Sequence, residues 1–317
     1  MCALSNMGMP LSQQTPHQPV LYHEIINALK PRSPGRYVDA TVGAGGHAWG
    51  ILNESSPDGL LLAFDQDPQA LEIACQRLSM FMPRTTLVHA SYVNLLEQIH
   101  KQGWQNVDGI LFDLGVSSMQ LDSPERGFSF QTRGPLDMRF DPGNPRKAAD
   151  LVNNLAESEL AEIIWRYGEE RSARRIAGAI VAARPLHTTQ DLAEVISKVV
   201  GRKGRIHPAT RTFQALRIAV NQELQAIETA LPQAVEALAT DGIVAVISFH
   251  SMEDRIVKQF FRRESSKCIC PPDLPVCSCN HQPVLRELTR HPITPGEAEL
   301  HENSRARSAR LRVAIKI

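Results

Sequence analysis

A glycine-rich segment and the acid that follows it form the first pattern in this sequence that can do chemistry. Residues 39–48 read DATVGAGGHA, with an apolar segment before them and a helical pattern after them. Glycines at such a turn let the backbone pass close beneath a ligand and leave the first N–H groups of the helix available. Asp65 ends the next apolar segment, where nucleotide-binding α/β folds keep a carboxylate for ribose hydroxyls. Together these residues predict a nucleoside-binding site in preference to a purely structural turn.

Two cofactors fit this pattern. Gly43-x-Gly45-x-x-Ala48 matches the dinucleotide fingerprint, so an NAD-dependent oxidoreductase stays open. Asp39, at the end of the first apolar segment, could instead reach the methionine end of S-adenosylmethionine. Because only one nucleotide-binding half is visible and no second βαβαβ unit follows for a nicotinamide, the sequence favours S-adenosylmethionine and methyl transfer.

Asp113 opens a second polar segment, DLGVSSMQLD over 113–122, directly after another apolar run. Ligands of open α/β sheets bind in the crevice at such strand ends. The exocyclic amine of a nucleobase is a poor nucleophile, because its lone pair is delocalised into the ring, and a hydrogen-bond acceptor on its N–H groups returns electron density. Asp113 is therefore a candidate for orienting an amine or for fixing the cofactor, with a turn-capping role as the third interpretation. The Asp/Asn-Pro-Pro-aromatic signature of amino methyltransferases is absent.

The elements that must position these residues alternate between strand and helix patterns. Fully apolar strands between helices indicate a parallel sheet covered on both faces, which is a doubly wound α/β fold. Strands are predicted at 37–40, 60–64, 86–89, 109–112 and 242–249, with a terminal hairpin of 284–290 and 309–315. A helix is predicted from Pro68, since proline suits the first helical position.

The alternation of strand and helix patterns ends after the fourth strand. Between 123 and 208 we find no convincing strand; the sequence predicts an ordered loop over 123–145 and helices at 157–167, 169–183 and 189–200, and then a long helix over 210–239. We therefore predict a core in two parts, 1–122 and 209–317, with an inserted helical domain at 123–208 that binds the substrate RNA.

The length and composition of the chain limit the number of domains and the class of protein that it can form. The 317 residues predict about two domains, and 43% hydrophobic with 21% charged residues excludes a disordered or fibrous chain. The first residues show no signal peptide and the longest apolar run is too short to cross a bilayer, so we expect a cytoplasmic protein with no membrane partner. The oligomeric state stays open, a homo-oligomer included.

The motifs in order resemble one family closely, the RsmH (MraW) family of bacterial 16S rRNA (cytosine-N4)-methyltransferases. The matching segments are His17-x-Pro-Val-Leu, Asp39-x-Thr-x-Gly-x-Gly-Gly-His, Asp65-x-Asp-Pro-x-Ala, DLGVSSMQLD (113–122), RGFSF (126–130), GPLDMR (134–139), YGEER (167–171), HPATRTFQALRI (207–218), NQEL (221–224), SFHSMEDRIVK (248–258) and NSRARSARLR (303–312). The resemblance implies a class I S-adenosylmethionine-dependent methyltransferase fold, a Rossmann-like doubly wound sheet. It also implies methylation of the N4 amine of a cytidine in the decoding centre of 16S ribosomal RNA.

The resemblance also assigns residues to the cofactor. Gly45, Gly46 and His47 would form the cofactor turn, Asp65 would hold the ribose, and Tyr92 would pack near the adenine. Asp113 and Gln120 would complete the site. For catalysis, Asp113 is the first candidate and His250 a weaker second, since a histidine at a strand end is more often structural.

The 34 basic and 34 acidic residues give a net charge of zero, but the basic residues are concentrated in part of the chain. Between Arg166 and Arg217 eleven Lys/Arg stand against four acids, a balance of 11 − 4 = +7. Such patches supply phosphate contacts that give affinity and register. We predict that Arg202, Lys203 and Arg205 clamp phosphate, against the alternative of a solvated helix surface. A third reading of the whole chain, besides methyltransferase and oxidoreductase, is a non-catalytic RNA-binding assembly factor.

Four of the six cysteines lie close together, as Cys268-x-Cys270 and Cys277-x-Cys279. Four thiolates suit structural zinc, but the usual ligand spacing is C-x₂-C. The sequence therefore favours free thiols in a surface loop over zinc, with a redox role as the third interpretation. Methyl transfer itself needs no metal.

Overall fold

The computed structural model describes residues 19–201, 207–271 and 276–317. It divides into two compact units, one made of the chain up to Leu114 together with Ala226–Ile317, and the other of Gly115–Gln225. The predicted insertion, 123–208, lies inside the second unit, whose ends lie further out in both directions. Among the described residues, no helix is both long and apolar enough to cross a membrane.

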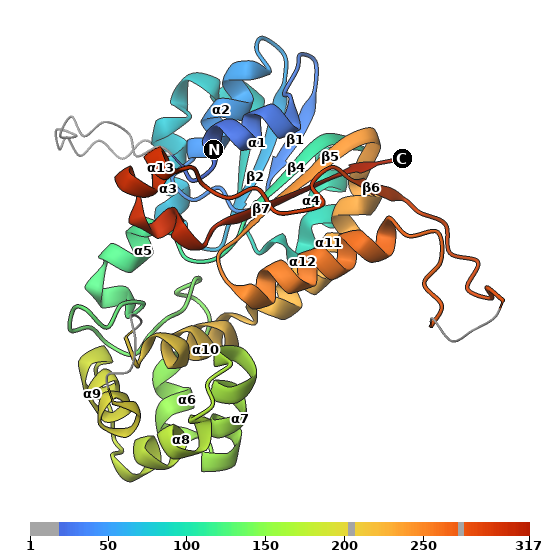
Figure 1. Cartoon of the computed structure of the whole chain (residues 1–317). Coiled ribbons are helices and arrows are strands. Elements are labelled where there is room, and N and C mark those ends of the chain that lie inside the picture. Colours follow the sequence, from blue (N-terminus) through green and yellow to red (C-terminus); the bar gives the residue numbers. More distant parts are fainter. Residues whose placement is uncertain (1–18, 202–206, 272–275) are drawn as a thin grey trace. The chain divides into compact units, whose positions relative to one another are not determined.

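The first unit is built on a seven-stranded sheet of order β3-β2-β1-β4-β5-β7-β6 (Figure 1). The strands β3, β2, β1, β4 and β5 run parallel to one another. The strand β7 runs antiparallel to both of its neighbours, β5 and β6. The strands are β1 (Arg36–Asp39), β2 (Leu60–Asp65), β3 (Thr85–His89), β4 (Val107–Asp113), β5 (Leu238–Ser248), β6 (Leu285–Glu287) and β7 (Arg310–Lys316). This order and the reversed β7 confirm the predicted methyltransferase variant of the doubly wound sheet.

Helices cover both faces of this sheet, because alternate strand residues point to opposite sides. On one face Val38, Phe64 and Phe112 pack in a core that includes residues of α4, α11 and α12. On the other face Tyr37 and Leu111 pack in a core with α1, α2 and α3. The helices are α1 (Tyr22–Leu29), α2 (Gly46–Glu54), α3 (Pro68–Arg77), α4 (Leu95–Lys101), α11 (Glu223–Ala237), α12 (Ser251–Glu264) and α13 (Glu297–Glu302).

A buried ion pair fastens α12 to β7. Arg312 donates to Asp254 over 2.6 Å and 3.3 Å, and Arg310 donates to the same carboxylate over 3.0 Å. Burial alone would raise the pKa of Asp254, but the hydrogen bonds from Arg312 and Arg310 outweigh it and hold the pKa below its ordinary value. Removing one partner of such a pair would leave an uncompensated buried charge.

The second unit is helical and has its own core. Leu160, Ile176, Leu192 and Phe213 are among the residues that pack at its centre. Its helices are α5 (Ser118–Asp122), α6 (Ala148–Asn154), α7 (Glu157–Gly168), α8 (Ala173–Ala182), α9 (Thr189–Val200) and α10 (Thr210–Asn221). No strand occurs in the described part of this unit, as the sequence predicts; it holds an isolated bridge between Pro135 and Thr188.

The long helix predicted over 210–239 is wrong. The structure has two helices there, α10 and α11, separated at Gln222, whose φ of 52° is left-handed. The side-chain amide of Asn221 donates to Met138 O and Arg217 O at 2.7 and 2.9 Å, which fixes the end of α10. The strand β5 then begins at Leu238, earlier than predicted.

The loop predicted as ordered over 123–145 is held by arginine side chains. Arg139 binds both oxygens of Asp137 at 2.7 and 2.8 Å and also donates to the carbonyls of Pro142 and Asn144. Arg126 donates to the carbonyls of Arg139 and Phe140, each at 2.9 Å. These donors satisfy loop carbonyls that no strand or helix would satisfy.

Candidate functional site

Three strands of the first unit end in an acid at the same edge of the sheet. Asp39 ends β1, Asp65 ends β2 and Asp113 ends β4. Since the carboxyl ends of parallel strands share one edge, the three carboxyl groups converge. Besides burial, the charge of Asp65 raises the pKa of Asp39, and the charge of Asp39 raises the pKa of Asp113. Open α/β sheets bind their ligands at the carboxyl ends of the strands, where these acids lie.

The glycine turn between β1 and α2 wraps around Asp65. The N–H of Gly43 donates to one Asp65 oxygen at 2.8 Å, and the N–H of Asp67 donates to the other at 2.9 Å. Gly43 and Gly45 have φ of 50° and 77°, left-handed values that favour glycine. A Cβ on Gly46 would lie 2.9 Å from Pro19 Cγ, so glycine at this position also serves packing.

Burial makes the acids unusually weak. It raises the pKa of Asp39 to about 7; the N–H of Thr41 opposes the rise and Asp65 adds to it. Burial, Asp39 and Glu253 together raise the pKa of Asp113 to about 8. The pKa of Asp65 is raised by burial as well, against its N–H donors. A positively charged ligand would therefore be favoured at this edge, because it would stabilise the ionised carboxylates.

His47 lies beside Asp113 but does not neutralise it. Its Nε2 is 3.8 Å from Asp113 Oδ2, and burial lowers the pKa of His47 to about 3, so the imidazole is neutral at pH 7. Neither this nitrogen nor Asp113 Oδ1 has a hydrogen-bond partner among the described residues. The Asp113 side chain as a whole is 26% exposed, but its Oδ1 atom is buried. Buried polar atoms of this kind are the ones a ligand can satisfy.

Tyr92 and His250 lie in different surroundings. Tyr92 follows β3 and packs edge-on against Phe112, with ring centroids 5.6 Å apart. His250 caps α12: its Nδ1 accepts from Glu253 N at 3.4 Å and its Nε2 lies 3.2 Å from Glu253 Oε1. These contacts give His250 a structural task, and its part in catalysis stays a prediction.

The remaining predicted site residues are Gln120 and three basic residues. Gln120 belongs to the second unit, where it forms a capping box with Ser117 at the start of α5. Arg202, Lys203 and Arg205 lie outside the described residues. The roles predicted for all four stay predictions.

Sequence reasoning missed Glu253. This side chain is 1% exposed and accepts from the N–H groups of Phe249 and His250 at 2.8 and 3.2 Å, and its charge helps to raise the pKa of Asp113. Its position in the sequence could have indicated this, because Glu253 lies in the first turn of α12, directly after β5, and β5 is the neighbour of β4. Acids at such positions are commonly explained as helix caps, so the signal was ambiguous.

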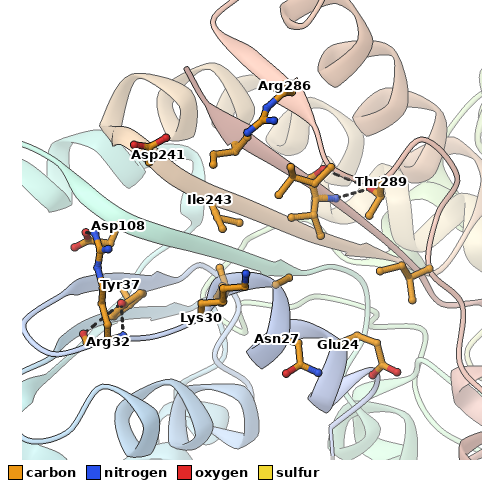
Figure 2. A pocket seen from close by; sticks show the side chains of 16 residues that line it. Glu24, Asn27, Lys30, Arg32, Tyr37, Asp108, Asp241, Ile243, Arg286 and Thr289 are labelled. Atoms are coloured by element: carbon orange, nitrogen blue, oxygen red, sulfur yellow. Dashed lines mark hydrogen bonds and ion pairs between the residues drawn. The ribbon is translucent and has the colours of Figure 1, made fainter.

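A cavity of about 710 Å³ opens elsewhere on the first unit (Figure 2). It is lined by residues from the beginnings of strands, among them Tyr37 and Asp108, with Ile243, Val313 and Ile315 supplying apolar walls. None of the three strand-end acids lines it. The cavity therefore belongs to the opposite edge of the sheet.

Residues 14–317 match the model of the MraW methylase family. The chain belongs to this family. It is 54% identical over 303 residues, 95% of this chain and 87% of the relative, to the ribosomal RNA small subunit methyltransferase H of Dehalococcoides mccartyi strain 195. It is 53% identical over 312 residues to the protein of the same name from Thermomicrobium roseum, covering 97% and 95% of the two chains. An rRNA methylase structure from Streptococcus thermophilus aligns with a TM-score of 0.43 at 12% identity, covering 93% and 95% of the two chains, too remote to support an inference.

Membership of the MraW methylase family decides among the alternatives that the sequence left open. A family match over almost the whole chain favours a methylase over an NAD-dependent oxidoreductase. The acidic edge described above is thus the candidate active site of an MraW-family protein.

The left-handed turn leads to a prediction for stability. Gly45→Ala should destabilise the protein by about 1–2 kcal/mol, the cost of placing an L-residue in a left-handed conformation. Its Cβ would also lie 3.4 Å from Ala74 Cα and Leu78 Cγ, which adds crowding. Urea denaturation of the wild type and the variant measures the difference.

Two glycines serve as controls. Gly103 has φ of 71°, and a Cβ added there would meet no atom within 4 Å, so Gly103→Ala reports the backbone cost alone. Gly296 has φ of −72° and open space, so Gly296→Ala should cost less than Gly45→Ala, since it loses only a favourable N-cap residue of the short helix α13. If Gly45→Ala proves as mild as Gly296→Ala, the turn is not constrained as described.

Proposed function

We propose that this protein transfers a methyl group from S-adenosylmethionine to the N4 amine of a cytidine in the decoding centre of 16S ribosomal RNA, acting in the cytoplasm on the small ribosomal subunit. The observation that carries the proposal is the convergence of Asp39, Asp65 and Asp113 at one sheet edge in an MraW-family chain. More than half of its residues are identical to those of proteins named ribosomal RNA small subunit methyltransferase H.

The residues at this edge fit S-adenosylmethionine. No side chain caps the N-terminus of α2 among the described residues, so its N–H groups suit the cofactor's carboxylate. Asp65 suits the ribose hydroxyls, because each carboxylate oxygen keeps a lone pair beyond the N–H bond it accepts. Asp39 and Asp113 suit the cationic groups of the cofactor. When bound, S-adenosylmethionine supplies an electrophilic methyl group.

Asp113 is the residue we assign to the amine of the base. A carboxylate can accept hydrogen bonds from the N4 amine, which holds the nitrogen in line and increases its electron density. This task needs the ionised form of Asp113, whose pKa of about 8 would leave it largely protonated at pH 7. A cationic ligand beside it favours ionisation, so the residue becomes competent when the site is filled. The target base must leave its stack to reach this edge.

Nucleoside mass spectrometry tests the proposed activity. Small-subunit rRNA incubated with the protein and methyl-labelled cofactor should yield labelled N4-methylcytidine, and Asp113→Ala should lower the rate by about 10²–10³, the usual cost of a lost transition-state hydrogen bond. Asp241→Asn, at the opposite sheet edge, is the control and should keep the wild-type rate. Full activity of Asp113→Ala would contradict a role of Asp113 in the reaction.

Cofactor binding should release protons. Asp39 and Asp113, with pKa values of about 7 and 8, are partly protonated at pH 7.5, and a cation beside them lowers both values. The release should therefore be largest near pH 7–8 and disappear at higher pH, where both groups are already ionised.

Calorimetry in buffers of different ionisation enthalpy measures this release. S-adenosylhomocysteine, which lacks the sulfonium charge, should release fewer protons, and Asp113→Asn should reduce the number for S-adenosylmethionine. A binding heat at pH 7.5 that is the same in every buffer would contradict the assignment.

The basic segment that contains Arg202, Lys203 and Arg205 is proposed to hold RNA phosphates. Changing these three residues to Ala should weaken binding to small-subunit rRNA and reduce the salt slope of the affinity by about 3, roughly one for each lost phosphate contact. Cofactor affinity should be unchanged. A triple variant of the exposed residues Lys101, Arg262 and Arg290 is the charge-matched control. Equal salt slopes for the two triple variants would speak against a phosphate clamp.

A further inference from the structure

The loop that carries the four cysteines is long. It connects Glu264, the last residue of α12, to Leu285, the first of β6, over 285 − 264 − 1 = 20 residues. Connections beyond about 12–15 residues without their own secondary structure are uncommon in compact domains. Its apolar side chains Ile269 and Val276 are 47% and 75% exposed. Apolar burial therefore does not hold the part of the loop around Ile269 and Val276 in place.

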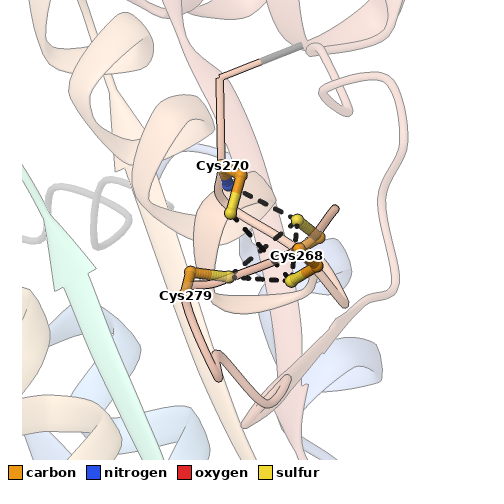
Figure 3. Close-up of side chains that lie close together, drawn as sticks. Cys268, Cys270 and Cys279 are labelled. Carbon is orange, nitrogen blue, oxygen red and sulfur yellow. Dashed lines mark hydrogen bonds between the residues drawn. The ribbon is translucent and has the colours of Figure 1, made fainter. Parts of the chain in front are cut away.

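The four thiols of the loop converge on one point (Figure 3). The Sγ of Cys277 lies 3.4 Å from that of Cys268, 3.5 Å from that of Cys279 and 4.0 Å from that of Cys270. The Sγ atoms of Cys268 and Cys279 are 3.9 Å apart, and all four lie within 4.8 Å of one another. Four sulfurs at about 2.3 Å from a zinc ion are separated by about 3.8 Å along each edge of their tetrahedron. The observed separations lie on both sides of that value.

These separations are too long for disulfide bonds. A disulfide brings two sulfurs to about 2.05 Å, whereas the shortest pair here is at 3.4 Å and all four cysteines are free. They are also short for four unrelated thiols on an exposed loop, where chain entropy would spread the side chains apart.

Backbone N–H groups point at the sulfurs, as they do toward charged acceptors. The N–H of Cys270 lies 3.4 Å from Cys268 Sγ, and the N–H of Ser278 lies 3.4 Å from Cys270 Sγ. Donors directed at the sulfurs suit thiolates, the form of cysteine that binds a metal ion.

We propose that Cys268, Cys270, Cys277 and Cys279 bind one structural zinc ion in a tetrahedral site. With four protein ligands the site has no open position, so the ion stabilises the loop and takes no part in catalysis. The C-x-C spacing, which argued against zinc in the sequence, is compatible with the geometry because the two pairs approach each other across the loop.

The ion would complete a loop that is already fastened at its base. Val284 N donates to Glu264 O at 2.9 Å, and His281 Nε2 lies 3.0 Å from Arg263 O. Ser266 Oγ donates to Arg262 O at 2.5 Å. These contacts fix where the loop leaves α12 and enters β6, and the zinc site would fix the part between them.

Metal analysis tests the proposal directly. Protein purified without chelators should contain about one zinc per chain, released when a mercurial reagent blocks the thiols. Cys279→Ser should lose the bound zinc, while Ser278→Ala in the same loop should keep it. Absence of zinc from the wild type, even after incubation with Zn²⁺ under reducing conditions, would overturn the proposal.

Cobalt substitution tests the ligand set without relying on a variant that folds. Wild-type protein stripped of metal and loaded with Co²⁺ should show the intense visible bands and thiolate charge-transfer absorption of a tetrahedral four-thiolate site. Weak octahedral bands, or two disulfides in the freshly purified protein by mass spectrometry, would contradict it. Removing the metal should also raise the rate of tryptic cleavage after Lys267, and an unchanged rate would exclude a stabilising role.

Discussion

The candidate active site depends on the burial of several carboxyl groups at one edge of a sheet, where no Lys or Arg of the described residues forms an ion pair with them. Leaving charge in such a place is costly, and the usual outcome is that the groups hold their protons. Asp39 and Asp113 follow this rule, with pKa values raised to about 7 and 8. The surroundings offer Asp39 and Asp65 backbone N–H groups and offer Asp113 a neutral histidine. The left-handed turn at Gly43 brings one of those N–H groups to Asp65.

The pair formed by Asp254 and Arg312 shows the opposite solution within the same unit. There a buried carboxylate receives two guanidinium groups and its pKa falls, so the charge is permanent and only the packing of α12 on β7 depends on it. The acid that fastens α12 to β7 is paired with arginine, whereas burial raises the pKa values of Asp39 and Asp113. This contrast supports the proposal that Asp39 and Asp113 receive a ligand, since raised pKa values of buried acids are frequent at functional sites.

Much of the sheet could be predicted because its signals are local. Apolar runs that end in Asp65 and Asp113 mark both the strands and the polar groups at their ends. The break at Gln222 could not be predicted, since glutamine seldom adopts a left-handed conformation and its cause is the contact of Asn221 with Met138, distant in the chain. Glu253 was missed for a similar reason: its effect on Asp113 exists only when β4 and β5 are paired. The number of cysteines was visible in the sequence, but the distances between their sulfurs were not.

The division of the chain into units has a consequence for biosynthesis. The helical unit, Gly115–Gln225, is continuous, whereas the sheet unit is made of one segment before it and one after it. Proteins fold largely from the N-terminus as they are synthesised. The helical unit is therefore complete while β4 still lacks β5, its later neighbour in the sheet. During that interval an apolar strand edge is exposed, the kind of edge that pairs with other chains. Rapid translation of the segment that carries β5, or protection of the nascent chain by a chaperone, would shorten the time for which the half-built sheet is open to aggregation.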